Sequence, residues 1–176
     1  MSNKPDRSIT RSFRVNDVAL KVIEKEAESQ GVSVNTFVNQ LFVKYAKIQR
    51  FLAKERWIQF PEPVLKDIFG LLTEEEVVEI GKKHGKTTGF QNLLRAMTGG
   101  TTPANFILYL KMICDTNSMN YTDVEDGRTR RFAIMHEVNR QFSIFLANQA
   151  SMALEDYGIF PKIILDDRVV VIEFAT

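Results

Sequence analysis

Residues 7–47 constrain the chain most, because they hold several secondary-structure signals in a stretch too short for a core. Polar and apolar residues alternate over residues 8–15, which predicts a short strand. Helical apolar spacing follows from about residue 18 to residue 30, and a second helix opens at residues 33–36. One strand and two helices in about 40 residues bury too little apolar surface to fold alone. We therefore expect the strand to pair with the same strand of a second copy.

Capping residues delimit both predicted helices. Asn16 or Asp17 can cap the first helix, and Gly31 suits a left-handed turn at its end. Ser33 or Asn35 can cap the second helix. The apolar positions on the two helices are Val18, Ala19, Val22, Ile23 and Ala27, then Val34, Phe37, Val38, Leu41, Phe42 and Tyr45. Because the spacing continues, we expect the second helix to be long, or nearly continuous with another, up to Pro61.

Three short motifs in this region resemble one known family. They are Phe13-Arg14-Val15, the helix signature at residues 24–31, and Ser33-Val34-Asn35. In their order and spacing, residues 7–50 are similar to ribbon-helix-helix DNA-binding domains, the fold of the Arc and methionine repressors. The resemblance implies a homodimer in which two strands form a ribbon, a shape that the DNA major groove admits.

Alternation along the predicted strand separates two faces. One face carries Ile9, Arg11, Phe13 and Val15, and the other carries Thr10, Ser12 and Arg14. We expect Phe13 and Val15 to point into the core. The polar set matches the base-reading strand positions of the family, so the resemblance implies that Thr10, Ser12 and Arg14 contact DNA bases. A plain solvated strand face is the alternative.

Two further groups are candidates for contact with DNA phosphates. The first is the N-terminus of the second helix, where the family clamps the DNA backbone and where free N–H groups and the helix dipole suit an anion. Its residues are Ser33, Val34, Asn35 and Thr36. The second group supplies cations near the strand and consists of Lys4, Arg7 and Arg11. The alternatives are a simple helix cap for the first group and solvated charges for the second.

Charge is distributed unevenly along the chain, although its formal net charge is +1. Residues 1–60 contain 11 Lys or Arg and 6 Asp or Glu, a net charge of +5. Residues 61–176 contain 12 and 16 of these, a net charge of −4. A basic N-terminal part beside an acidic remainder is typical of a DNA-binding domain attached to a body that does not touch DNA.

Pro61-Glu62-Pro63 marks the start of a second domain. Helical patterns cover residues 63–72, 73–84, 90–97 and 102–114. The expected order then continues as a polar loop at 117–127, a strand at 130–136, a helix at 139–157, and a hairpin of 160–165 with 168–174. We therefore predict an α+β chain. Its parts are a ribbon-helix-helix domain at 1–50, a helical extension or linker at 51–60, and, at 61–176, a mainly helical segment followed by an α-β-α-β-β helix-on-antiparallel-sheet domain.

Several classes of protein are disfavoured by the sequence. The chain has no apolar run of transmembrane length and no apolar signal core, and its single cysteine, Cys114, fits a reducing cytoplasm. His84, His136 and Cys114 lack metal-ligand spacing, so we expect no metal site and no cofactor. No phosphate-binding glycine loop or paired catalytic carboxylates point to an enzyme. Phe142 and Phe145 could enclose a small ligand, although packed core is the simpler interpretation.

The combined prediction is a cytoplasmic, homodimeric, sequence-specific transcriptional regulator that binds double-stranded DNA. Its C-terminal domain would serve higher oligomerisation, an effector or a protein partner. The alternative is an antitoxin that represses its own operon and holds a toxin with its tail. Antitoxin tails are usually short and disordered when free, whereas residues 61–176 have the apolar content of a folded domain. A structural role in DNA packaging, without sequence preference, is a third hypothesis.

Overall fold

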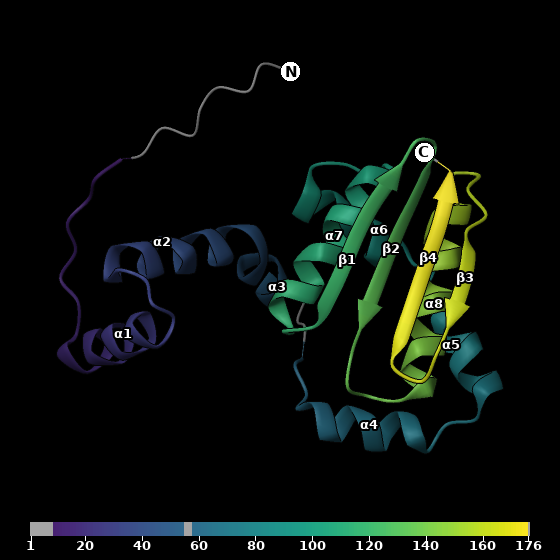
Figure 1. Ribbon diagram of the computed structural model, residues 1–176, viewed down its shortest axis with the longest axis horizontal. Coiled ribbons are helices and arrows are strands. Elements are labelled where there is room, and N and C mark those ends of the chain that lie inside the picture. Colours follow the sequence, from purple (N-terminus) through teal and green to yellow (C-terminus); the bar gives the residue numbers. More distant parts are fainter. Residues whose placement is uncertain (1–8, 55–57, 176) are drawn as a thin grey trace. The chain divides into compact units, whose positions relative to one another are not determined.

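A computed structural model describes residues 9–54 and 58–175 of the chain. It divides the chain into two compact units, Met1–Ala46 and Lys47–Thr176. The elements are helices and one antiparallel sheet (Figure 1), which confirms the predicted α+β class.

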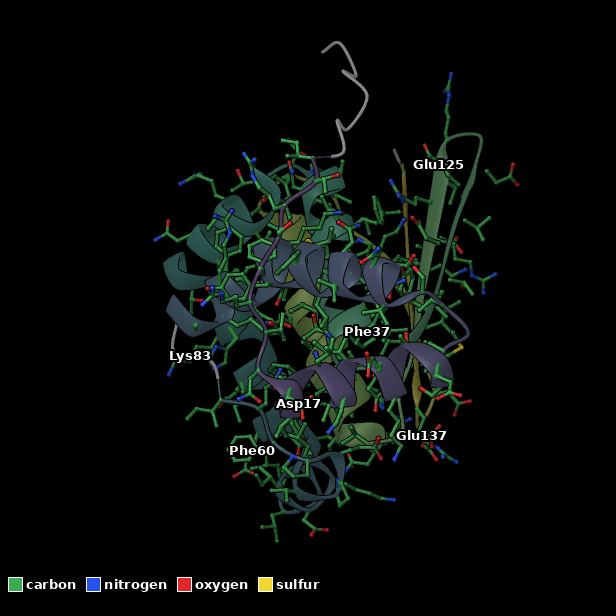
Figure 2. All side chains as sticks on the ribbon, turned by 90° about the vertical axis from the view of Figure 1, so that its left-hand side faces the viewer. Asp17, Phe37, Phe60, Lys83, Glu125 and Glu137 are labelled. Atoms are coloured by element: carbon green, nitrogen blue, oxygen red, sulfur yellow. The ribbon has the colours of Figure 1, made fainter. Side chains whose placement is uncertain are left out.

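The first unit contains a pair of helices, α1 (Asp17–Ser29) and α2 (Val34–Lys44). Asn16 caps α1, and its side-chain oxygen accepts hydrogen bonds from the N–H groups of Val18 at 2.9 Å and Ala19 at 3.3 Å. Figure 2 shows Phe37 on the side of α2 that faces α1. The first helix therefore starts where the capping signal predicts.

The connection between α1 and α2 is a tight turn built on Gly31. This residue has a φ of +66°, in the left-handed region where a side chain would be strained. The N–H of Val32 then donates to the carbonyl oxygen of Ala27 at 3.0 Å and closes the end of α1. Ser33 caps α2 by accepting a hydrogen bond from the N–H of Thr36 at 3.1 Å.

The helical path continues beyond α2, through the π-helical turn η1 (Tyr45–Gln49) and the short helix α3 (Arg50–Lys54). Ile48 and Leu52, with 5% and 8% of their surfaces exposed, belong to the core of the second unit. The second unit therefore begins before residue 51, and part of the predicted linker at 51–60 is packed core.

Four antiparallel strands form the sheet of the second unit, in the order β1-β2-β4-β3. They are β1 (Asn120–Asp126), β2 (Thr129–Met135), β3 (Lys162–Leu165) and β4 (Val169–Ala175). Figure 1 shows helices α7 (Pro103–Thr116) and α8 (Arg140–Glu155) behind the sheet, against one face. The largest fully buried side chains of this unit are Phe106, Phe132, Leu94, Ile107, Ile134, Leu154 and Ile172.

Strand β1 corrects the polar loop expected at residues 117–127. The order of the last elements is therefore α-β-β-α-β-β, not α-β-α-β-β, and the sheet has four strands where three were expected. β1 lies at an edge of the sheet and pairs with β2 alone, so much of its surface is open to solvent and tolerates polar residues. Figure 2 shows Glu125 near the tip of the hairpin that β1 and β2 form.

An inward carboxylate explains why β1 does not look like a strand. Asp123 pairs with Phe132 across the sheet, and its side chain is only 11% exposed. Arg130 donates two hydrogen bonds to this carboxylate, at 2.8 and 2.7 Å, and the Lys111 ammonium lies 2.6 Å from it. These partners, Arg130 above all, lower the pKa of Asp123 to about 2. The charge is therefore neutralised locally, so the strand can place it on the core side of the sheet.

Two glycines allow helix α5 (Glu74–Gly85) to approach α8 closely. A Cβ atom at Gly81 would lie 2.8 Å from the carbonyl oxygen of Phe145, and one at Gly85 would lie 2.6 Å from that of Gln149. Both distances are below any van der Waals contact, so larger residues would force the helices apart. This contact fixes α8 from its outer side, while the same helix packs on the sheet.

The packing of Leu52 gives a direct test of where the second unit begins. Leu52→Ala should lower the free energy of unfolding by about 2–4 kcal/mol, because it removes a buried side chain and leaves a cavity. Leu71→Ala is the matched control: Leu71 is 86% exposed, and its substitution should change stability by less than about 0.5 kcal/mol. Urea unfolding monitored by circular dichroism measures both. Equal stability of the two variants would show that residues 47–54 are not part of this core.

Candidate functional site

The predicted base-reading residues Thr10, Ser12 and Arg14 lie in residues 9–16, which precede α1 and have no regular secondary structure in the single chain. All three are exposed. A strand acquires its hydrogen-bond ladder from a neighbouring strand, and the described part of the first unit contains just one such segment. The ribbon therefore stays a prediction about the dimer.

The first unit lacks a core of its own. Among the described residues 9–46, Ala27 alone is buried. Ile9, Phe13 and Val15 are 67%, 65% and 53% exposed. Val18 and Val22 on α1, Leu41, Phe42 and Val43 on α2, and Tyr45 at the start of η1 are also at least 40% exposed. Such a concentration of exposed apolar side chains in one small unit marks an interaction surface.

Phe13 already contacts this surface within the chain. Its ring centroid lies 5.8 Å from that of Phe42 on α2, at an interplanar angle of 59°. Both residues remain more than half exposed, at 65% and 54%. The segment before α1 is thus attached to the helix pair through an aromatic contact that covers only part of each ring.

The predicted phosphate-binding residues lie in three different situations: at the N-terminus of α2, before α1, and outside the described residues. Ser33, Val34, Asn35 and Thr36 form the N-terminus of α2, and the Ser33 cap engages the N–H of Thr36. The N–H groups of Val34 and Asn35 are then the backbone donors of this helix end that suit an anion. Arg11 is exposed before α1, whereas Lys4 and Arg7 lie outside the described residues.

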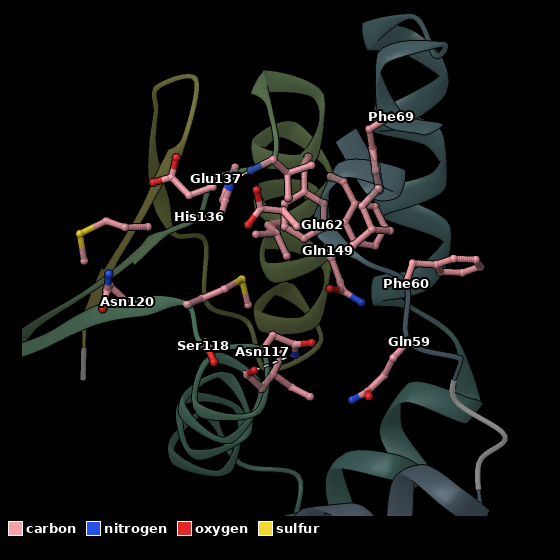
Figure 3. A pocket seen from close by; sticks show the side chains of 18 of the residues that line it. Gln59, Phe60, Glu62, Phe69, Asn117, Ser118, Asn120, His136, Glu137 and Gln149 are labelled. Carbon is pink, nitrogen blue, oxygen red and sulfur yellow. Dashed lines mark hydrogen bonds between the residues drawn. The ribbon is translucent and has the colours of Figure 1, made fainter. Parts of the chain in front are cut away.

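The second unit contains a cavity of about 460 Å³, a volume within the range of small-molecule sites. Its walls come from α3 and residues 58–60, from helix α4 (Glu62–Gly70), from α7 and the turn after it, from the start of β1, from the end of β2 and from α8 (Figure 3). Phe69 on α4 and Phe142 and Phe145 on α8 form an aromatic wall, with ring centroids 5.2–6.1 Å apart. Phe142 and Phe145, the pair singled out in the sequence, both line the cavity.

Helix α4 is attached to α8 at one side of this cavity. Apart from the Phe69 contacts, the Asn139 side-chain amide donates a hydrogen bond to the carbonyl oxygen of Lys66 at 2.9 Å. Much of the rest of α4 is open to solvent: Val64 and Ile68 are 39% and 42% exposed. The helix therefore covers the cavity through a small number of contacts.

His136 lines the cavity in a fixed, neutral form. Its Nδ1 atom accepts a hydrogen bond from the N–H of Val138 at 3.3 Å, so the ring proton sits on Nε2, 2.9 Å from the Ser143 hydroxyl. That hydroxyl donates in turn to the carbonyl oxygen of Asp167 at 3.2 Å. Burial, partly opposed by the Glu137 carboxylate, lowers the pKa of His136 to about 4.

The sequence could not reveal this cavity as a whole. Its lining comes from segments as distant as Leu52 and Gln149, which no short motif connects. Phe142 and Phe145 could be recognised as candidates because they follow helical spacing in an aromatic-rich helix. Asn120 and Glu62 could not be recognised, because Asn120 was assigned to a polar loop and Glu62 to a proline-rich domain boundary.

The described residues show three further features, which concern metal binding, membranes and the single cysteine. None of their His, Cys, Asp or Glu side chains form a group of three or more that could hold a metal ion. No helix within the described ranges is long and apolar enough to cross a membrane. Cys114 is buried in the core, where burial raises the pKa of its thiol to about 12.

The neutral state of His136 predicts a loss of stability at mildly acidic pH. Between pH 7 and pH 5 an unfolded histidine, with its ordinary pKa of 6.5, takes up a proton, whereas folded His136 stays neutral until about pH 4. The free energy of unfolding should therefore fall by about 1–2 kcal/mol more in the natural chain than in His136→Asn. Urea titrations at both pH values measure this difference. His84→Asn, at an exposed position, is the control and should keep the natural pH dependence.

No protein-family model matches the chain, and no curated protein matches it. The geometry described above provides two candidate sites: the exposed apolar and polar surface of the first unit, and the cavity of the second unit.

Proposed function

We propose that the chain is a sequence-specific DNA-binding transcriptional regulator that acts as a homodimer. In this proposal, residues 9–15 of two copies pair as an antiparallel ribbon that enters the major groove. Thr10, Ser12 and Arg14 contact bases, and the N-terminus of α2 contacts the DNA backbone.

The observation that carries the proposal is the missing core of the first unit. Two capped helices and the segment before them expose Phe13, Val15 and the apolar positions of α1 and α2, while Ala27 alone is buried among the described residues 9–46. A second copy of the same unit supplies both a partner strand and a matching apolar surface. Two-fold symmetry achieves this with one self-complementary patch, which is the commonest way for soluble chains to assemble.

Alternation gives the paired strands a polar outer face. If Phe13 and Val15 are buried between the two copies, Thr10, Ser12 and Arg14 point away from them. A ribbon then presents six such side chains, with an arginine from each strand suited to guanine. The operator should consist of two related half-sites, either palindromic or directly repeated.

Local charge favours the same segment. Residues 1–16 contain four Lys or Arg and one acidic residue, whereas residues 17–43 contain two Lys and four acidic residues. The cations are therefore concentrated before α1, in and beside the proposed ribbon. Attraction to phosphate acts most strongly where the positive charge is closest, so this distribution orients the segment toward DNA.

Dimerisation through the first unit gives the first test of this proposal. Phe13→Ser should raise the dimer dissociation constant at least about 100-fold, because each copy loses about 1.5–3 kcal/mol of apolar burial. Ser12→Ala is the matched control on the opposite face and should leave the constant nearly unchanged. Sedimentation equilibrium over a range of concentrations measures both. A natural chain that stays a folded monomer at micromolar concentration would contradict the proposal.

DNA reading by Arg14 gives the second test. A target is first selected from a library of random duplexes with the natural full-length chain. Arg14→Ala should then weaken binding to the selected duplex by about 1–3 kcal/mol and change binding to a scrambled duplex little. Gel shift at fixed salt concentration measures the two affinities.

The control variant is Arg128→Ala, an exposed arginine in the turn between β1 and β2. It removes the same charge from the second unit and should leave binding to both duplexes unchanged. An equal loss on the selected and scrambled duplexes in Arg14→Ala would assign Arg14 to the DNA backbone. No selectable sequence at all would argue for binding without base reading.

A further inference from the structure

We propose that the cavity of the second unit binds a small organic cation with a flat apolar body. This inference does not depend on DNA binding, since every residue that carries it belongs to the second unit. The cavity supplies three features that such a ligand needs: an aromatic wall, an excess of negative charge, and a side-chain amide that is available for hydrogen bonding.

The aromatic wall favours a flat ligand. Phe142 and Phe145 are stacked at 21°, and Phe69 lies across both of them at 75° and 56°. Their rings belong to two helices, α4 and α8, and line the same cavity. A planar apolar group gains both burial and ring contacts against such a wall. A cation beside the ring faces is further stabilised by their quadrupoles.

The charges that line the cavity favour a cation over an anion. No lysine or arginine is among the described residues that line it, whereas Glu62 and Glu137 are. Glu137 is paired with Arg168, so its charge is largely compensated. Glu62 is an exposed residue that makes no ion pair with any described residue, and Figure 3 shows its carboxylate directed toward the space between α4, β2 and α8. His136 is buried, which disfavours its charged form, so it adds no positive charge.

Polar groups at the same cavity allow a ligand to be oriented. The Gln149 side-chain amide lines the cavity and makes no hydrogen bond to any described residue, so both its donor and its acceptor are available. Asn117 donates from Nδ2 to the carbonyl oxygen of Ile113 at 2.8 Å, which leaves its side-chain oxygen as an acceptor. A few placed polar groups on an otherwise apolar surface are typical of small-molecule sites.

A matched series of three probes tests the charge preference. The probes are 1-naphthylmethylammonium, 1-naphthalenemethanol and 1-naphthoate, which share one flat ring system and differ in charge. Calorimetric titration of the full-length chain should give the tightest binding for the cation and the weakest for the anion. The affinities of these two should differ by about tenfold or more, because the anion meets an uncompensated carboxylate in a partly apolar site. Binding of the anion as tightly as the cation would overturn the proposal, as would no binding of any probe at millimolar concentration.

Two substitutions locate the binding. Glu62→Gln should weaken the cation about three- to fivefold and leave the alcohol unchanged, because one partly exposed charge pair is lost. Glu79→Gln, an exposed position on α5 outside the cavity, is the matched control and should change neither affinity. Leu65→Trp adds bulk to the cavity wall formed by α4 and should weaken all three probes. If Glu79→Gln acts like Glu62→Gln, or if Leu65→Trp has no effect, the cations bind elsewhere and the assignment fails.

Discussion

The central constraint on this molecule is that its first unit cannot bury its own apolar side chains. Two short helices and the segment before them carry many apolar side chains, but among the described residues 9–46 only Ala27 is buried. Capping by Asn16 and Ser33 and the turn at Gly31 still define the helices locally. Local signals therefore set the secondary structure, whereas tertiary structure in this unit requires another surface. Our functional proposal follows from the proposition that this surface is a second copy.

The second unit differs from the first because it buries its apolar core within one chain. Helix α8 connects its parts: one side packs on the sheet, and close approach at Gly81 and Gly85 fixes α5 against another side. α8 also contributes Phe142, Phe145 and Gln149 to the cavity. The cavity exists because α4 touches α8 through few groups, with Phe69 and the Asn139–Lys66 hydrogen bond prominent among them. A rigid helix faced by a lightly attached one leaves room for a ligand.

Much of the fold could be predicted from the sequence, and the exceptions have physical reasons. The helix pair could be predicted from Asn16, Gly31 and Ser33, because helix capping is a local interaction. Strand β1 was missed because Asp123 breaks the apolar pattern, and its charge is tolerated only through Arg130 and Lys111, which the sequence does not place beside it. The burial of Leu52 in the core of the second unit was missed for a similar reason. Whether a given position on a continuing helix is buried depends on residues distant in the sequence that pack against it. The sequence singled out only Phe142 and Phe145 as residues that could enclose a ligand, with packed core as the favoured interpretation, because the other walls of the cavity come from segments that only the fold brings together.

The central claim concerns the pairing of residues 9–15 between two copies, and isotope-filtered NMR tests it most directly. A sample is prepared by mixing and refolding isotope-labelled and unlabelled chains, so that contacts between copies are separated from contacts within one copy. Our account predicts backbone contacts between residues 9–15 of the labelled chain and the same residues of the unlabelled chain, in an antiparallel pattern. Contacts of this segment confined to its own chain, in a sample shown to be dimeric, would contradict it.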